Sequence, residues 1–116
     1  MFADEDYSKV PIFVADTEDY DSLLKMTARA KLIMNTVGPY RFYGEAVIKA
    51  CLETKTHHVD VSGEPQFMES MQLKYHDEAL NNGVYLLSSC GFDSIPADLG
   101  VIFLQKEFDG TFVHQK

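Results

Sequence analysis

Basic residues, cysteine and long apolar runs are all scarce in this sequence, and each scarcity excludes a class of protein. Ten Lys and Arg stand against 18 Asp and Glu, which gives a formal net charge of −8. The basic footprint of a nucleic-acid-binding protein is therefore missing, and we predict no nucleic-acid partner. No apolar stretch approaches the ~20 residues that a membrane-spanning helix needs. Residues 1–9 are acidic and lack the basic and apolar regions of a signal peptide, so we predict an intracellular protein with a disordered start over residues 1–9.

Cysteine and histidine offer little for metal binding. Cys51 and Cys90 lie far apart in apolar surroundings, which favours reduced packing residues over a disulfide or a metal site. The adjacent His57 and His58 have no companion at metal-ligand spacing. We interpret them as surface or strand-edge residues and predict no metal site.

What the sequence does contain is a repeated alternation of strand and helix. Four apolar runs, at residues 10–15, 31–37, 57–62 and 84–89, each end in small polar or acidic residues, and a helical pattern follows each one. Such units predict an α/β fold with a doubly wound, mostly parallel sheet. One domain is expected from the length of 116 residues.

Cap and break residues set the expected helix limits. Thr17 can cap the first helix, Pro65 fits the first turn of a helix over residues 65–82, and Gly83 ends that helix. Ser94 can cap a last helix over residues 95–108. A helix over residues 42–54 is expected to bury one face, made of Tyr43, Ala46, Val47, Ala50 and Cys51.

The polar joints are candidate ligand sites, because ligands bind beyond the carboxyl ends of the strands in such sheets. Asp16 can accept a hydrogen bond from an adenine amino group, or it is simply an acid at a helix entry. The Asn35 amide can hold neighbouring loops or a ligand. Gly38 permits close approach of a ligand to the backbone and Pro39 fixes the turn, although a Gly-Pro pair after a strand is also an ordinary turn.

Two further joints carry polar groups. The turn of Ser62, Gly63 and Glu64 resembles a nucleotide or substrate turn, and equally resembles a capping sequence ahead of the next helix. Asp60 lies in a strand expected to be buried, where a carboxylate needs a partner, and we favour a structural hydrogen bond. Asp93 or Ser94 can meet a ligand, with helix capping the favoured role of Ser94.

Three stretches together resemble one family. Residues 35–45 (NTVGPYRFYGE), 60–67 (DVSGEPQF) and 91–100 (GFDSIPADLG) are similar, in order and spacing, to the saccharopine dehydrogenase-like oxidoreductases, and the resemblance runs from about residue 10 to residue 110. It implies a Rossmann domain, NAD or NADP as cofactor, and oxidoreductase activity on a small-molecule substrate that remains unidentified. It also implies association with lipid droplets or membranes, a link to glycolipid biosynthesis, and a mitochondrial location as one alternative.

The resemblance assigns cofactor-binding roles by position. Asp16 matches an acid near the adenine. The turn beside the central part of the cofactor is matched by Asn35, Val37, Gly38 and Pro39, and the turn near the nicotinamide by Ser62, Gly63 and Glu64.

Family members open with a strand and a Gly-rich turn of G-x-x-G-x-x-G type that holds the pyrophosphate, and nothing in residues 1–9 supplies it. We therefore expect residues 10–116 to be a partial NAD(P)-binding Rossmann domain. It would lack its first two strands and its Gly-rich fingerprint, be inactive alone, and associate with lipid through absent parts. The alternatives are a non-catalytic, lipid-droplet or membrane-associated protein with a Rossmann shell, and a flavodoxin-like binding domain.

The expected strand order makes one more prediction. In the order 3-2-1-4-5-6, residues 10–15 would be strand three and residues 31–37 strand four. We expect these two to pair directly, because an unpaired buried strand leaves backbone groups unsatisfied.

Overall fold

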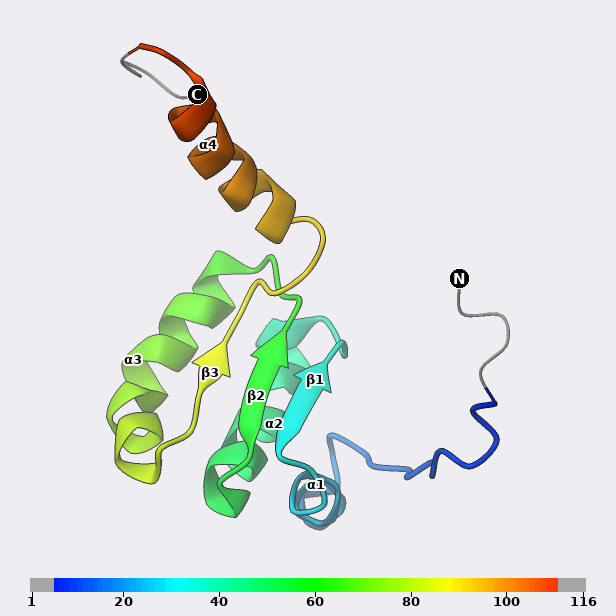
Figure 1. Cartoon of the computed structure of the whole chain (residues 1–116). Coiled ribbons are helices and arrows are strands. Elements are labelled where there is room, and N and C mark those ends of the chain that lie inside the picture. The colour runs from blue at the N-terminus through cyan, green and yellow to red at the C-terminus, as the bar shows by residue number, and fades with distance from the viewer. Residues whose placement is uncertain (1–5, 111–116) are drawn as a thin grey trace.

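Residues 6–110 form an open three-stranded parallel sheet with helices between successive strands (Figure 1). The computed structural model describes residues 6–110. The strands lie in the order β1-β2-β3, and the pairing sets Asn35 beside Asp60 and His58 beside Leu86. The strands are β1 Leu32–Asn35, β2 His57–Asp60 and β3 Leu86–Leu87, and the helices are α1 Tyr20–Thr27, α2 Tyr40–Thr54, α3 Pro65–Asn82 and α4 Ile95–Glu107. The predicted parallel α/β sheet is confirmed, with strands shorter than expected.

One face of the sheet is covered and the other is open. Side chains alternate between the faces of a strand. Asn35, His58 and Asp60 point toward the helices and are buried, whereas Leu32 and Met34 on the opposite face are 50% and 70% exposed. Parallel sheets are normally covered on both sides, so this open face is an unusual feature of the described chain.

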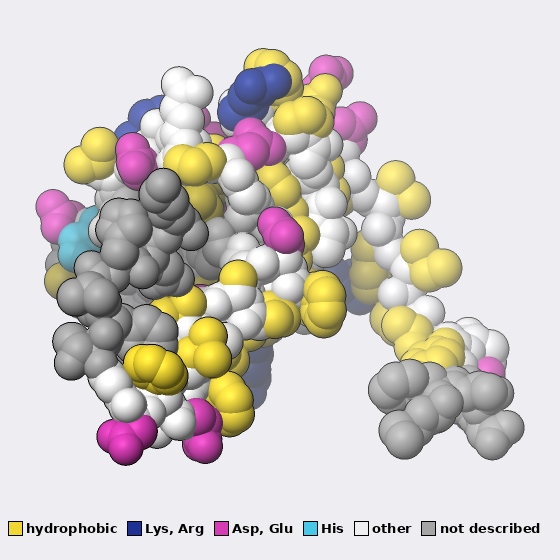
Figure 2. All heavy atoms as spheres, turned by 90° about the horizontal axis from the view of Figure 1, so that it is seen from above, with side chains coloured by type: hydrophobic (Ala, Val, Ile, Leu, Met, Phe, Trp, Pro, Cys, Tyr) yellow, Lys and Arg dark blue, Asp and Glu magenta, His cyan; other side chains and the backbone are white. Residues whose placement is uncertain are grey.

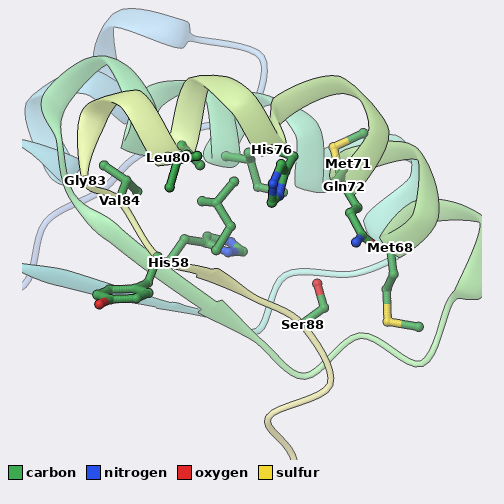
Figure 3. A pocket seen from close by; sticks show the side chains of 13 residues that line it. His58, Met68, Met71, Gln72, His76, Leu80, Gly83, Val84 and Ser88 are labelled. Atoms are coloured by element: carbon green, nitrogen blue, oxygen red, sulfur yellow. The ribbon is translucent and has the colours of Figure 1, made fainter.

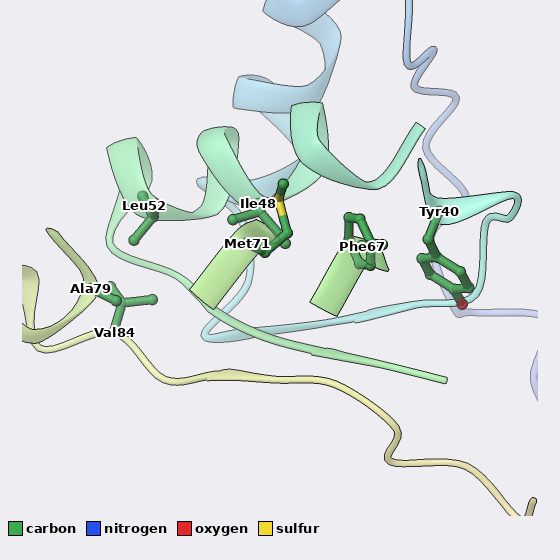
Figure 4. Close-up of a cluster of buried hydrophobic side chains, with 7 residues drawn as sticks. All are labelled: Tyr40, Ile48, Leu52, Phe67, Met71, Ala79 and Val84. Carbon is green, nitrogen blue, oxygen red and sulfur yellow. The ribbon is translucent and has the colours of Figure 1, made fainter. Parts of the chain in front are cut away.

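The main core lies between α2 and α3 (Figure 4). Seven buried side chains form it: Tyr40, Ile48, Leu52, Phe67, Met71, Ala79 and Val84. The helices meet closely where Gly44 faces the Phe67 ring, since a Cβ on Gly44 would lie 2.6 Å from a ring carbon. As predicted, Pro65 lies in the first turn of α3 and Gly83 ends the helix in the left-handed conformation.

A second core joins α1 to α2. Leu23, Val47, Ala50 and Cys51 are its buried members, so the packing role predicted for Cys51 is confirmed. Beneath them Thr27 Oγ1 donates to the Ala50 carbonyl (3.3 Å), which satisfies a buried hydroxyl.

Two details of the predicted helices are wrong. Asp19, not Thr17, is the N-cap of α1, and its Oδ1 accepts from the Ser22 amide (3.3 Å). Tyr43 is exposed rather than inward. Helix α2 begins two residues earlier than predicted, and Tyr40 and Gly44 are buried in its first turns.

The predicted first strand, residues 10–15, is wrong. This segment is a coil in which Ile12 and Val14 are 92% and 94% exposed, and it forms an arm with exposed hydrophobic side chains (Figure 2). The Arg29 guanidinium lies 3.7 Å from the centre of the Phe13 ring. The expected direct pairing with β1 is wrong. In the expected 3-2-1-4 order two strands would separate the two segments, and residues 6–110 contain no strand for either place.

The two ends of the described chain differ in character. Of the predicted disordered start, residues 1–5 lie outside the described residues, and the Ser8 amide donates to Asp6 Oδ1 (2.9 Å) in a turn. Helix α4 follows Ser94 as predicted, but no residue of α4 is buried and the helix extends away from the sheet (Figure 1). Within residues 6–110, no helix is long and apolar enough to cross a bilayer.

Candidate functional site

The turns after β1, β2 and β3 meet at the carboxyl edge of the sheet, the end toward which the arrows point in Figure 1. Seven of the eight predicted cofactor residues lie in two of these turns: Asn35, Val37, Gly38, Pro39, Ser62, Gly63 and Glu64. The structure therefore brings the two predicted turns together at one edge.

Asn35 closes β1 and carries an unused donor. Its side chain is buried, and its Oδ1 accepts from the Val37 amide (3.0 Å). Its backbone carbonyl accepts from the Tyr40 hydroxyl (3.0 Å). Burial is the main cause that raises the pKa of the Tyr40 phenol, so this hydroxyl stays protonated. Asn35 Nδ2, in contrast, has no hydrogen-bond partner within residues 6–110.

The turn after Asn35 is open to solvent. The Gly38-Pro39 peptide is cis, and Pro39 is the N-cap residue of α2. Val37 is half exposed. A Cβ on Gly38 would meet only ordinary contacts with the Tyr40 ring. Packing within the described chain does not require glycine there, which leaves room for an approaching ligand.

The turn after β2 is bonded to the turn after β1. Ser62 Oγ accepts from the Glu64 amide (3.1 Å), and the two oxygens of Glu64 accept from the amides of Tyr40 (2.8 Å) and Arg41 (3.0 Å). Glu64 thus caps α2, the helix that follows the other turn, although it is itself the N-cap residue of α3. Gly63 has open space around its Cα.

Asp60 fixes the turns after β2 and β3 relative to each other. Its carboxylate is fully buried and accepts from the Ser62 amide (3.0 Å), the Ser88 hydroxyl (2.9 Å) and the Ser89 amide (3.3 Å). The Ser89 hydroxyl donates a hydrogen bond to the Ser62 carbonyl (2.8 Å). The structural role favoured for Asp60 is confirmed. At the next joint Ser94 is the N-cap residue of α4, without a side-chain capping bond.

The hydrogen bonds of Asp16 within residues 6–110 go to residues at the start of α1 and not to this edge. Its Oδ1 accepts from the Glu18 amide (2.9 Å), and its own amide donates to Ser22 Oγ (2.9 Å). These bonds fit the alternative reading of Asp16 as an acid at the entry of α1.

The edge has the chemistry of a site for polar, uncharged groups. It offers the free Asn35 amide and open backbone at Gly38 and Gly63. It does not offer an anion site at α2, because Glu64 already occupies the helix N-terminus. Sequence reasoning missed this cap, since the partners are 24 residues apart and only the fold brings them together. Residues 6–110 contain no group of three or more potential metal ligands.

The backbone resembles a known dehydrogenase. Saccharopine dehydrogenase (L-Glu forming) from Saccharomyces cerevisiae, in its apo form, superposes with a TM-score of 0.63 at 24% sequence identity. The match covers 79% of this chain and 19% of that one. The fold is therefore of the Rossmann type, with the parallel strands and crossover helices described above.

Sequence comparison gives the family. The family described as saccharopine dehydrogenase NADP binding domain matches residues 1–87, and the chain belongs to this family. It is 55% identical over 104 residues to a saccharopine dehydrogenase-like oxidoreductase of Homo sapiens. It is 53% identical over 110 residues to a lipid droplet localized protein of Caenorhabditis elegans.

A plant relative extends the comparison. A probable mitochondrial saccharopine dehydrogenase-like oxidoreductase of Arabidopsis thaliana is 48% identical over 87% of this chain. The alignments cover 90% of this chain with the human relative and 95% with the nematode one. They span only about a quarter of those proteins, 24% and 26% of their lengths.

Proposed function

We propose that this chain forms one side of the NAD(P) crevice of an oxidoreductase in the saccharopine dehydrogenase family. The observation that carries the proposal is the buried Asn35 Nδ2, a donor without a partner in residues 6–110, at the carboxyl end of β1. Leaving a buried donor unpaired costs about 1–3 kcal/mol. A ribose hydroxyl or a carboxamide oxygen of the cofactor would supply the missing acceptor.

The other turn residues fit the uncharged parts of a dinucleotide. Val37, Gly38 and Pro39 would face its central part and Gly63 the nicotinamide side. Ser62 is fully buried and would act by holding the Glu64 amide. Glu64 would act by positioning, because both its oxygens are bonded to α2. A nicotinamide cofactor would supply hydride transfer when bound. The pyrophosphate, in contrast, has no helix N-terminus at α2 to accept it.

The 116-residue chain should therefore bind NADH or NADPH weakly and turn nothing over by itself. Calorimetric titration of both cofactors tests this. Micromolar affinity for either would show that these turns suffice and would contradict the expectation of weak binding.

The location of the site has its own test, by NMR titration with NADPH at millimolar concentration. The amides of Val37, Gly38 and Gly63 should shift in the unmodified chain. Asn35→Asp keeps the acceptor for the Val37 amide and removes the free donor, so it should reduce these shifts. Asn81→Asp, on the exposed surface of α3, is the matched control and should leave them unchanged. Shifts confined to other residues would refute the proposal.

A second candidate function is a non-catalytic role at lipid droplets. The nematode relative is named for its localisation to lipid droplets, and a non-catalytic protein with a Rossmann shell can share that location. A fluorescent fusion of the chain, imaged in cells loaded with oleate, tests it: a ring around droplets would support this candidate, and a diffuse signal would oppose it for residues 1–116.

A further inference from the structure

A cavity of about 460 Å³ is lined by residues of α3, β2 and β3 and by Ser88 in the turn after β3 (Figure 3). Methionine and aliphatic side chains make up most of its wall, among them Met68, Met71, Leu80, Val84 and Leu86. Its volume falls within the ~300–1,000 Å³ typical of ligand pockets. Methionine side chains adapt readily to differently shaped apolar groups.

One buried polar group belongs to this cavity. His58, on the helix-covered face of β2, is 1% exposed and lines the cavity (Figure 3). Its Nε2 has no hydrogen-bond partner within residues 6–110. A buried polar atom without a partner is costly, and such atoms are rare in native proteins. A group that enters the cavity would supply the missing partner.

The protonation of His58 defines what that partner must be. Burial lowers the pKa of the imidazole, and the nearby Asp60 carboxylate only partly opposes this, so the ring is neutral at pH 7. Nδ1 lies 4.0 Å from Asp60 Oδ2, and the carboxylate charge favours the tautomer with its proton on Nδ1. Nε2 is then an acceptor, and the partner must be a donor.

We propose that this cavity binds a small neutral molecule with an apolar body and a single hydroxyl or N–H donor, which bonds to His58 Nε2. The apolar wall would hold the body of the ligand by burial, and His58 would fix its orientation. The cavity shares none of the seven predicted cofactor residues at the carboxyl edge. It is therefore a second site, distinct from those seven residues, although Ser88 in its wall is bonded to Asp60 beside the Ser62 turn.

A pair of matched probes tests the proposal. Fluorescence titration would compare 2-naphthol, which carries a hydroxyl donor, with its methyl ether, which has nearly the same shape but no donor. The full chain should bind 2-naphthol at least about tenfold more tightly, the usual scale for losing one hydrogen bond to a buried group. The Nε2 resonance of His58 should shift during the 2-naphthol titration and stay in place with the ether.

Two variants complete the experiment. His58→Phe keeps a flat ring and removes the acceptor, so it should bring the two affinities within about twofold of each other. His57→Phe puts the same change on the next residue, which does not line the cavity, and should preserve the preference. The wild-type comparison decides even if a variant does not fold: equal affinities, or no binding of 2-naphthol, would overturn the proposal.

Discussion

The carboxylate of Glu64 and the backbone amide of Tyr40 form a 2.8 Å hydrogen bond between the turns that follow two neighbouring strands. The second oxygen of Glu64 accepts from the Arg41 amide (3.0 Å). The start of α2 is therefore held by a residue at the start of α3. As a result, the turn at Gly38 and the turn at Gly63 cannot move independently without breaking a charge-assisted cap.

Removing this cap should destabilise the protein. Glu64→Ala leaves two amides at the start of α2 without their acceptor, and we expect a loss of about 1–2 kcal/mol in the free energy of unfolding. Urea unfolding monitored by circular dichroism measures it. Glu69→Ala, on an exposed position of α3, should change stability little, and equal losses in both variants would contradict the capping role.

Two glycines in helices should respond oppositely to the same change. Gly44→Ala puts a methyl group within 2.7 Å of two Phe67 ring carbons, and overpacking of this kind costs about 1–3 kcal/mol. Gly100→Ala, in α4, meets nothing within 4 Å and should be neutral or should stabilise by up to about 1 kcal/mol. Thermal unfolding of both variants tests the contrast, which fails if Gly44→Ala is as stable as the parent.

The two thiols should differ sharply in reactivity. Burial raises the pKa of Cys51 to about 12, so at pH 8 its reactive thiolate is almost absent in the folded protein. Cys90 is partly exposed and should react first with a thiol reagent such as DTNB. We expect one rapidly labelled thiol, with Cys51 labelled only in denaturant, and mass mapping of the labelled peptides would identify each.

The same shift predicts weakening in alkali. A thiol whose pKa is raised by folding stabilises the folded state fully below its ordinary value of 9.0, because both states are then protonated. Between pH 9 and about 12 the unfolded state loses the proton first, so stability falls as the pH rises. Cys51→Ala should flatten this part of the stability profile, at the cost of a cavity. An unchanged slope would contradict the assignment to Cys51.

Acid should weaken the protein through His58. Burial lowers the pKa of this ring below its ordinary value of 6.5, so the unfolded state takes up the proton first. The stabilisation is present above pH 6.5 and is lost as the pH falls through the lowered pKa of the folded state. Urea midpoints between pH 7.5 and pH 5 should fall in the parent and change less in His58→Phe, with His57→Phe as control.

The isolated chain should be only marginally stable. Strand β1 has one partner within residues 6–110, one face of the sheet is open, and α4 has no buried residue. Each feature leaves apolar surface or backbone groups without the contacts that stabilise a complete parallel sheet. A cooperative thermal transition of the purified chain in the ordinary mesophile range, ~45–65 °C, would contradict this expectation.

Local patterns predicted the central part of the fold well. The helix expected over residues 65–82 is α3, and Phe67, Met71 and Ala79 are buried on it at helical spacing, because the 3.6-residue period is a property of the segment itself. Pro65 and Gly83 marked its ends for equally local reasons. The strand predicted over residues 10–15 was wrong because a strand forms only when another strand pairs with it. The apolar pattern of a segment does not show whether such a partner is present.

The candidate site could be predicted in position but not in detail. Strand ends in a parallel sheet meet at one edge, so the turns at Gly38 and Gly63 were expected to be neighbours. The cap from Glu64 and the burial of His58, which was expected at a surface or strand edge, depend on contacts between distant segments. The hydrogen-bonded role of Asp60 could be predicted from the sequence, because a carboxylate between two apolar residues of a buried strand requires a hydrogen-bond partner.

The strand order β1-β2-β3 has a consequence for how the chain folds as it is made. Both strand pairings within residues 6–110 join strands that follow each other along the chain, with one helix between them. A nascent polypeptide leaving the ribosome would thus find the partner of each new strand already formed, and would close only one short crossover at a time. These strand pairings do not depend on a segment that is synthesised much later, so this part of the sheet can form during translation.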